Sequence, residues 1–211
     1  MKKKITSVLA LTIAAASLPV TALAADNSAP VTKNGERLKY NTPYYLKDKN
    51  LPDKGGVTFE HWGLDDFVLF AESSTDNGTP IIFENKDGAD GFIESNDEIR
   101  IKSTKANEPG VQYWARDALF DSIYLNYDNT IDHIIYGSSE DNSIGLGSFM
   151  TGLDPNTGKM FYNFLEYKGG NEKKAWMKSG SFQYVSNPGN GRFTLPLDDK
   201  QTPFEVMEAS E

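Results

Sequence analysis

Short runs of alternating apolar and polar residues restrict this chain to an all-β fold. The clearest runs are Arg37–Leu46, Glu98–Ser103, Ser122–Tyr127 and Met160–Tyr167. Side chains of a strand point alternately to its two faces, so a period of two predicts strands that bury one face. After the first two dozen residues no window sustains the apolar spacing of a long helix. The stretch Trp114–Phe120 predicts a single helical turn at most.

Three longer stretches share one form, an aromatic strand, a polar turn and an apolar strand. They are FVLFAESSTDNGTPIIF at 67–83, HIIYGSSEDNSIGLGSF at 133–149 and FQYVSNPGNGRFTL at 182–195. Asn and Gly tolerate the positive φ of a tight turn, so each stretch predicts a β-hairpin. The alternative is that any all-β chain carries several similar polar turns.

Self-similar copies indicate a fold built from repeated units. We expect three units of about four strands each, at about 31–84, 92–150 and 160–207. This arrangement predicts a β-trefoil, in which six strands close a barrel and three hairpins cap it. Closing the barrel removes most exposed strand edges. A β-sandwich is the alternative all-β fold.

The first 24 residues are expected to be a leader rather than part of the fold. Lys2–Lys4 form a basic start, an apolar stretch runs from Ile5 to about Val20, and Ala22–Ala24 has the A-x-A form of a cleavage site. This pattern is typical of a secretory signal peptide, and a retained membrane anchor is the less favoured alternative. We expect one domain over residues 25–211, secreted or periplasmic, from a bacterium.

Composition excludes several classes of partner and chemistry. The chain has a formal net charge of −9 and no cysteine. Removing the leader, which carries three lysines and no acid, makes the charge more negative still. Long-range attraction to nucleic acid or to an anionic membrane is therefore not expected. Disulfides and thiolate chemistry are excluded. We expect a monomer without a cofactor.

The predicted core consists of apolar residues on the expected strands, with glycines relieving strain in the turns. The core residues are Leu38, Tyr45, Leu46, Val68, Ile82, Ile99, Ile101, Leu195 and Val206, and the turn glycines are Gly55, Gly78 and Gly191. These residues argue for a fold and not for an activity.

Several short motifs occur in a characteristic order along the chain. Gly35 and Leu38 precede Tyr44-Tyr45-Leu46, then come Gly55-Gly56-Val57, the hairpin motif DNGTPIIF at 76–83, Trp114, and the ending GNGRFTLPLDDKQTPFEVME at 189–208. In this order the chain resembles the Kunitz-type soybean trypsin inhibitor family over nearly the whole mature sequence. The resemblance implies a β-trefoil that binds a protease without being an enzyme.

The resemblance places the protease-facing loop at Glu84–Gly91, with Lys86, Asp87, Gly88, Ala89 and Asp90 as the candidate contact residues. Lys86 would suit a trypsin-like pocket. Counting back from Phe92 places the key position nearer Ala89, which would suit an elastase-like or subtilisin-like pocket. The disulfides of the family have no counterpart here, because the chain has no cysteine.

The same region is rich in carboxylates, which raises the question of a calcium site. Asp87, Asp90, Glu94 and Asp97 are hard oxygen ligands, but their spacing does not match a calcium-binding loop. We interpret them as a solvated acidic loop and expect no metal.

Carbohydrate or host-surface binding, as in a lectin-like or toxin-associated trefoil, is the main alternative function. Sugar-binding sites combine an exposed aromatic ring with Asn or Asp side chains. The candidates are His61-Trp62 with Asp65 and Asp66, Tyr127-Asp128-Asn129, and Trp176 with Asn171. Burial in the core is the alternative for each tryptophan.

No motif in the sequence indicates an enzyme. The two histidines, His61 and His133, have no histidine or cysteine nearby to complete a zinc site. The Gly-x-Ser-x-Gly motif of serine hydrolases is absent. Nothing selects a pair among the 30 acids for glycoside hydrolysis.

Overall fold

The computed structural model describes residues 29–117, 122–127, 133–138, 141–153, 159–169, 175–179, 183–186 and 202–210. The expected leader, residues 1–24, lies outside this set. The described residues form strands and turns with no helix. The strands are β1 Pro43–Asp48, β2 Val57–Trp62, β3 Asp65–Phe70, β4 Ile81–Asn85, β5 Asp97–Ser103, β6 Tyr113–Asp117, β7 Ser122–Asn126, β8 His133–Gly137, β9 Ile144–Leu153, β10 Lys159–Gly169, β11 Ala175–Ser179, β12 Gln183–Ser186 and β13 Phe204–Glu208. Across this part of the chain, no helix has the length and apolar content needed to cross a membrane.

Six strands close into a barrel. Going round it, β1 pairs with β4, β4 with β5, β5 with β8, β8 with β9, β9 with β13, and β13 with β1, all antiparallel. Because the ring closes, each barrel strand has a neighbour on both sides and no edge is left open.

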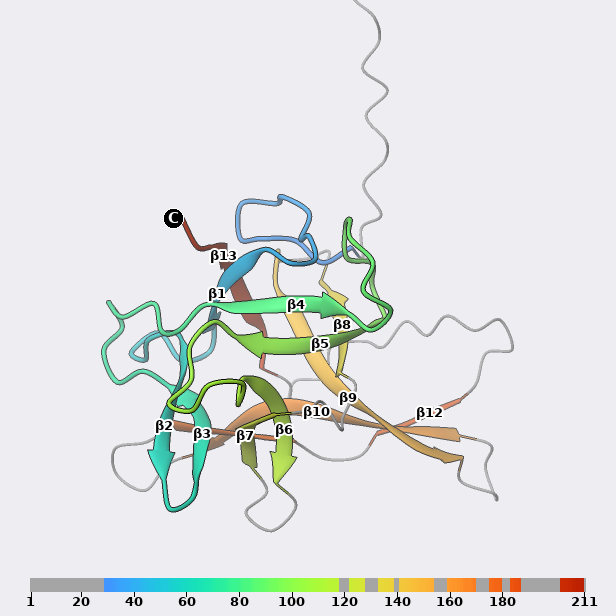
Figure 1. Ribbon diagram of the computed structural model, residues 1–211. Helices are drawn as coiled ribbons and strands as arrows, with labels where there is room; N and C mark the ends of the chain where they lie inside the picture. Colours follow the sequence, from blue (N-terminus) through green and yellow to red (C-terminus); the bar gives the residue numbers. More distant parts are fainter. Residues whose placement is uncertain are drawn as a thin grey trace, which may run out of the picture.

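Three further strand pairs form a cap at one end of this barrel. These hairpins are β2–β3, β6–β7 and β10–β11, and β3 also pairs with both β7 and β11, which links them. Figure 1 shows β2, β3, β6 and β7 below the barrel strands β4 and β5. A six-stranded barrel with three hairpins is a β-trefoil, so the predicted fold class is confirmed.

The predicted hairpin at 67–83 is wrong, although the fold inferred from it is right. Strand β3 pairs with β2, β7 and β11, whereas β4 pairs with β1 and β5. The connecting segment 71–80 instead runs back along the start of β2. There Gly56 N–H donates to Asp76 O at 2.8 Å, and Thr79 N–H donates to Val57 O at 2.9 Å.

The stretch 133–149 does form a hairpin, because β8 and β9 pair along their length. The two similar stretches therefore have different places in the trefoil. One carries the chain from the cap to the barrel, and the other joins two neighbouring barrel strands. Most of the third stretch, 182–195, lies outside the described residues.

The predicted helical turn at Trp114–Phe120 is also wrong for residues 114–117, the part of it that the structure describes. Residues 113–117 form β6, and Trp114 pairs with Leu125 of β7. The Trp114 side chain is fully buried in the core. Cross-strand pairing and burial of this large ring override the weak local helical pattern.

Most of the predicted core is confirmed. Leu38, Leu46, Val68, Ile99, Ile101 and Val206 are buried in one cluster. Tyr45 and Ile82 are only half-buried, because their neighbours Tyr44, Ile81 and Phe83 occupy the inner face. A shift of one residue along a strand exchanges its two faces, and this accounts for both errors. Leu195 and Gly191 lie outside the described residues.

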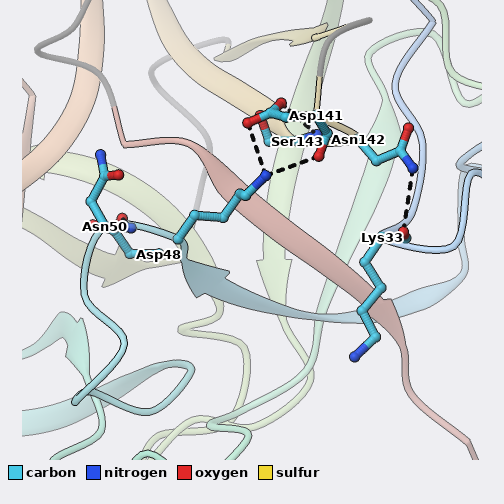
Figure 2. A network of polar contacts seen from close by, with 7 residues as sticks. Lys33, Asp48, Asn50, Asp141, Asn142 and Ser143 are labelled. Atoms are coloured by element: carbon cyan, nitrogen blue, oxygen red, sulfur yellow. Dashed lines mark hydrogen bonds and ion pairs between the residues drawn. The ribbon is translucent and has the colours of Figure 1, made fainter.

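Hydrogen bonds and an ion pair connect the β8–β9 turn to the segments before and after β1 (Figure 2). Lys49 Nζ lies 2.9 Å from both the backbone oxygen and Oδ2 of Asp141. Asp141 Oδ1 accepts hydrogen bonds from Ser143 Oγ at 2.6 Å and Ser143 N at 3.2 Å. Asn142 Nδ2 donates to Lys33 O at 3.4 Å. Partial burial acts to raise the pKa of Asp141, but hydrogen bonds from Ser143 and Lys49 lower it to about 2.

Replacing Asp141 with alanine should lower the free energy of unfolding at neutral pH by about 1–2 kcal/mol, because partly exposed hydrogen bonds are lost. A folded-state pKa below the ordinary value of 3.8 means that this contribution is complete above about pH 4. It is lost as the pH falls from about 4 through about 2. Denaturant unfolding at both ends of this range measures the effect. Asp141→Asn, which keeps an acceptor for Ser143, should lose less. An equal loss in Asp141→Ala at both pH values would contradict the role of the charge.

Candidate functional site

The loop between β4 and β5 begins with a tight turn. Asn85 Oδ1 accepts the Asp87 N–H at 2.8 Å, and Asn85 O accepts the Gly88 N–H at 3.0 Å. Lys86 lies within this turn, with its Nζ 2.6 Å from Glu98 Oε2 on β5. The short polar side chain of Asn85 thus fixes the direction in which the chain leaves the barrel.

The far end of the loop is held by the segment before β1. Asn41 Nδ2 donates to Asp90 Oδ1 at 2.5 Å, and Tyr40 N–H donates to Gly91 O at 2.9 Å. Asn41 N–H also donates to Phe83 O of β4, at 2.9 Å. Asn41 adopts φ 59°, a conformation that asparagine tolerates better than most residues. This single residue therefore connects strand β4 of the barrel to the end of the loop.

The chain after the loop is packed against the same segment. Phe92 pairs with Lys39 in an isolated bridge, and the Arg37 guanidinium lies 4.6 Å from the Phe92 ring centre. Ile93 is fully buried, and its N–H donates to Leu38 O at 2.9 Å. Buried apolar contact and backbone pairing therefore fix the exit of the loop.

The carboxylates that follow the loop each have their own partner. Asp97 Oδ2 accepts hydrogen bonds from Tyr40 OH at 2.5 Å and from Glu94 N–H at 2.7 Å. Burial, followed by the hydrogen bond to Asp97, raises the pKa of Tyr40. Glu94 forms an ion pair with Arg37. Within the described residues, no three His, Cys, Asp or Glu side chains gather in a way that could hold a metal ion.

The five candidate contact residues, Lys86, Asp87, Gly88, Ala89 and Asp90, form one continuous exposed stretch. Gly88 and Gly91 have φ of 75° and 122°, the left-handed region that glycine enters without strain. Ala89 and Asp90, between these glycines, keep negative φ. Between its two glycines the loop therefore exposes a two-residue stretch, Ala89-Asp90, and the Ala89 side chain is a methyl group.

The alternative site lies on the β2–β3 hairpin. Trp62 is 50% exposed, and its ring packs edge-on against Phe67 with the centres 5.7 Å apart. His61 Nδ1 lies 3.1 Å from Asp66 Oδ1. Asp66 is buried and also accepts hydrogen bonds from Asn107, from Nδ2 at 2.6 Å and from the backbone N–H at 3.1 Å.

The other predicted aromatic candidates are only partly described. Tyr127 is 64% exposed, and its OH donates to Glu108 Oε2 at 3.0 Å. Asp128, Asn129 and Asn171 lie outside the described residues, as does the side chain of Trp176.

No family model matches the sequence, and no curated protein matches it. Solved structures do match the fold. The bifunctional α-amylase/subtilisin inhibitor from rice, Oryza sativa, superposes with a TM-score of 0.59 at 15% identity, over 86% of this chain and 99% of that chain. Soybean trypsin inhibitor, in its complex with porcine pancreatic trypsin, has a TM-score of 0.63 at 12% identity and the same coverage. Alocasin, a protease inhibitor from giant taro (Arum macrorrhizon), has a TM-score of 0.63 at 15% identity over 86% of this chain.

Identities this low establish the fold alone. The resemblance to Kunitz-type soybean trypsin inhibitors is therefore confirmed as a shared β-trefoil covering most of the chain. The three similar structures named here are inhibitors rather than enzymes.

Proposed function

We propose that this protein is a protein-binding module that inhibits a protease through the loop Lys86–Asp90. The observation that carries the proposal is that the loop is exposed yet bonded to the barrel at both ends, by Asn85 at its start and by Asn41 and Tyr40 at its end. A loop that is already ordered loses little conformational entropy when it binds. No residue of the loop is chemically consumed in such binding.

The fold supports the same function. The three similar structures are inhibitors of subtilisin and α-amylase, of trypsin, and of a protease. A fold alone does not determine a function, so the proposal depends mainly on the geometry of the loop.

The side chains of the loop favour Ala89 as the residue that enters the enzyme pocket. The Lys86 ammonium is paired with Glu98, and the Asp90 carboxylate is bonded to Asn41, so both charged groups have partners within the protein. Ala89 carries only a methyl group, which suits a small apolar pocket. We therefore propose an elastase-like or subtilisin-like target in preference to a trypsin-like one.

The backbone of the loop sets an expectation for affinity. A substrate-like segment pairs with a protease as an extended strand, which requires negative φ at each residue. The left-handed φ of Gly88 and Gly91 confines that geometry to Ala89 and Asp90. We expect weaker binding than for a loop extended over its whole length.

The test is a titration of the purified chain, from residue 25 onward, against trypsin-like, elastase-like and subtilisin-like serine proteases and against cysteine proteases. We expect one-to-one inhibition of an elastase-like or subtilisin-like enzyme, with the protein remaining uncut. If no enzyme of the panel is inhibited and the protein is still intact, the proposed function is wrong.

A further inference from the structure

A second exposed surface directly follows the candidate loop. It is formed where residues 37–41, before β1, lie beside residues 90–94, after the loop, and Lys39 and Phe92 form an isolated antiparallel bridge between them. Phe92 is three residues beyond Ala89, so their Cα atoms are at most about 11 Å apart. A protein that covers Ala89 therefore also comes close to this surface.

The two segments have a buried side and an exposed side. Leu38 and Ile93 are fully buried, and Ile93 N–H donates to Leu38 O at 2.9 Å. Their neighbours in the chain are accessible: Phe92 is 49% exposed, the Arg37 side chain is 37% exposed, and Lys39 is exposed. We call the exposed side the Phe92 face and define it by Arg37, Lys39 and Phe92. The buried residues fix its backbone, so little ordering is needed when a partner binds.

The three side chains of the Phe92 face contact one another. The Arg37 guanidinium lies over the Phe92 ring, 4.6 Å from the ring centre, and Lys39 Nζ lies 5.8 Å from the same centre. Arg37 also forms an ion pair with Glu94, whereas Lys39 has no ion pair with any carboxylate of the described residues. The face therefore combines an oriented aromatic ring with one cation that is already neutralised and one that is not.

The backbone at Gly91 separates this face from the substrate-like part of the loop. A segment bound as an extended strand requires negative φ, but Gly91 has a φ of 122°. The chain therefore leaves the extended path after Asp90, and Phe92 does not continue along the cleft behind Ala89. Phe92 instead faces the surface that surrounds the cleft of a bound enzyme.

We propose that the Phe92 face is a second contact surface for the target protease, and that it packs on an apolar patch bordered by a carboxylate beside the enzyme's cleft. This inference rests on the proposed function of the loop. Aromatic and arginine side chains are enriched at protein interfaces and often contribute most of the binding energy. Phe92 supplies the apolar contact, and the Lys39 ammonium pairs with the carboxylate at the edge of the patch.

The charge of the face favours a protein over an anionic polymer or an anionic membrane. Binding to such polymers depends on many cations that each neutralise a phosphate. The Phe92 face has two cations, one of which is paired with Glu94, on a chain with a formal net charge of −9. A single unpaired cation beside an aromatic ring fits one carboxylate at the edge of a protein interface.

The test measures inhibition constants for the protease that the natural chain, from residue 25 onward, inhibits most strongly. Phe92→Ala should raise the constant at least about tenfold, because a buried aromatic contact is lost. Phe92→Tyr keeps the ring and should stay within about threefold of the natural chain. Tyr127→Ala is the matched control, because this 64% exposed ring follows β7 in the cap, away from the β4–β5 loop (Figure 1), and its removal should leave the constant unchanged.

A second pair of variants tests the charge. Lys39→Gln should raise the constant about threefold at about 0.05 M salt, and the difference from the natural chain should vanish at about 0.5 M salt, because salt screens exposed charges. Lys105→Gln makes the same change in net charge at an exposed position between β5 and β6. It should leave the constant unchanged at both salt concentrations.

The outcomes distinguish this inference from the proposed function. If the natural chain inhibits a protease and both Phe92→Ala and Lys39→Gln inhibit it equally well, the second contact surface is wrong while the proposed function stands. If the natural chain inhibits no protease, both are wrong. A purely structural role of Phe92 would lower Tm and leave the inhibition constant of the folded protein unchanged, which would also overturn the inference. If Phe92→Ala does not fold, Lys39→Gln decides, because the Lys39 side chain is exposed.

Discussion

Replacing Ala89 with arginine is expected to abolish inhibition of an elastase-like or subtilisin-like protease and to create inhibition of a trypsin-like one. A small apolar pocket has no room for the longer side chain, and burying an unpaired guanidinium there is costly. We expect the inhibition constant for the original enzyme to rise at least about 100-fold, which corresponds to a loss of about 3 kcal/mol in binding free energy. Inhibition constants for the three enzyme classes measure both changes.

Two comparisons make this result specific to position 89. Ser74→Arg adds the same group to another exposed loop and should leave all three constants unchanged. Lys86→Gln tests the other candidate contact residue. If Lys86→Gln removes inhibition of a trypsin-like enzyme while Ala89→Arg changes nothing, Lys86 is the residue that enters the pocket, and our assignment is wrong.

The position of the candidate loop could be predicted from sequence, but the groups that hold it could not. The loop follows the apolar residues of β4 and precedes the alternating residues of β5, and both patterns are local. Asn41, which bonds Asp90, lies before β1 and has no pattern that points to the loop. Barrel closure brings the segment before β1 alongside β4 and the loop, and Asn41 adopts a left-handed conformation there.

The repeats illustrate the same limit at the level of the fold. The segments 67–83 and 133–149 have similar amino-acid sequences because both pass from a buried strand through a polar turn to another buried strand. Strand partners depend on contacts far away in the chain, and β3 finds its partners in β2, β7 and β11. The sequence thus predicted how many strands and turns there are better than how they pair.

The alternative site on the β2–β3 hairpin shows which parts of a site are local. His61 and Asp66 are close in the sequence and contact each other across the hairpin, as their grouping as candidates suggested. Asn107 and Glu108 were missed, because they come from the β5–β6 connection and carry no distinctive motif. Tyr127 was singled out with the two residues that follow it, whereas its described partner is Glu108.

Replacing Gly56 with alanine is expected to destabilise the protein more than any exposed substitution. A Cβ at this position would lie 1.9 Å from Asn77 O and 3.0 Å from Leu46 O, both backbone atoms that cannot rotate away. Gly56 also bonds Asp76 and Ala71 through its own N–H and C=O. Making room for one methyl group therefore requires the segment 71–80 to move off β2 and break these bonds.

We expect a loss of about 3 kcal/mol or more in the free energy of unfolding, or about 6–12 °C in Tm for a chain of this size. Thermal and denaturant unfolding measure it. Gly63→Ala is the matched control: a Cβ there meets nothing within 4 Å, and only its φ of 70° costs energy, about 1 kcal/mol. An equal effect of the two substitutions would mean that the close approach at Gly56 does not matter. The segment 71–80 enters β4 at its start, whereas the candidate loop leaves β4 at its end. We therefore expect inhibition by Gly56→Ala to fall only as much as the folded fraction falls.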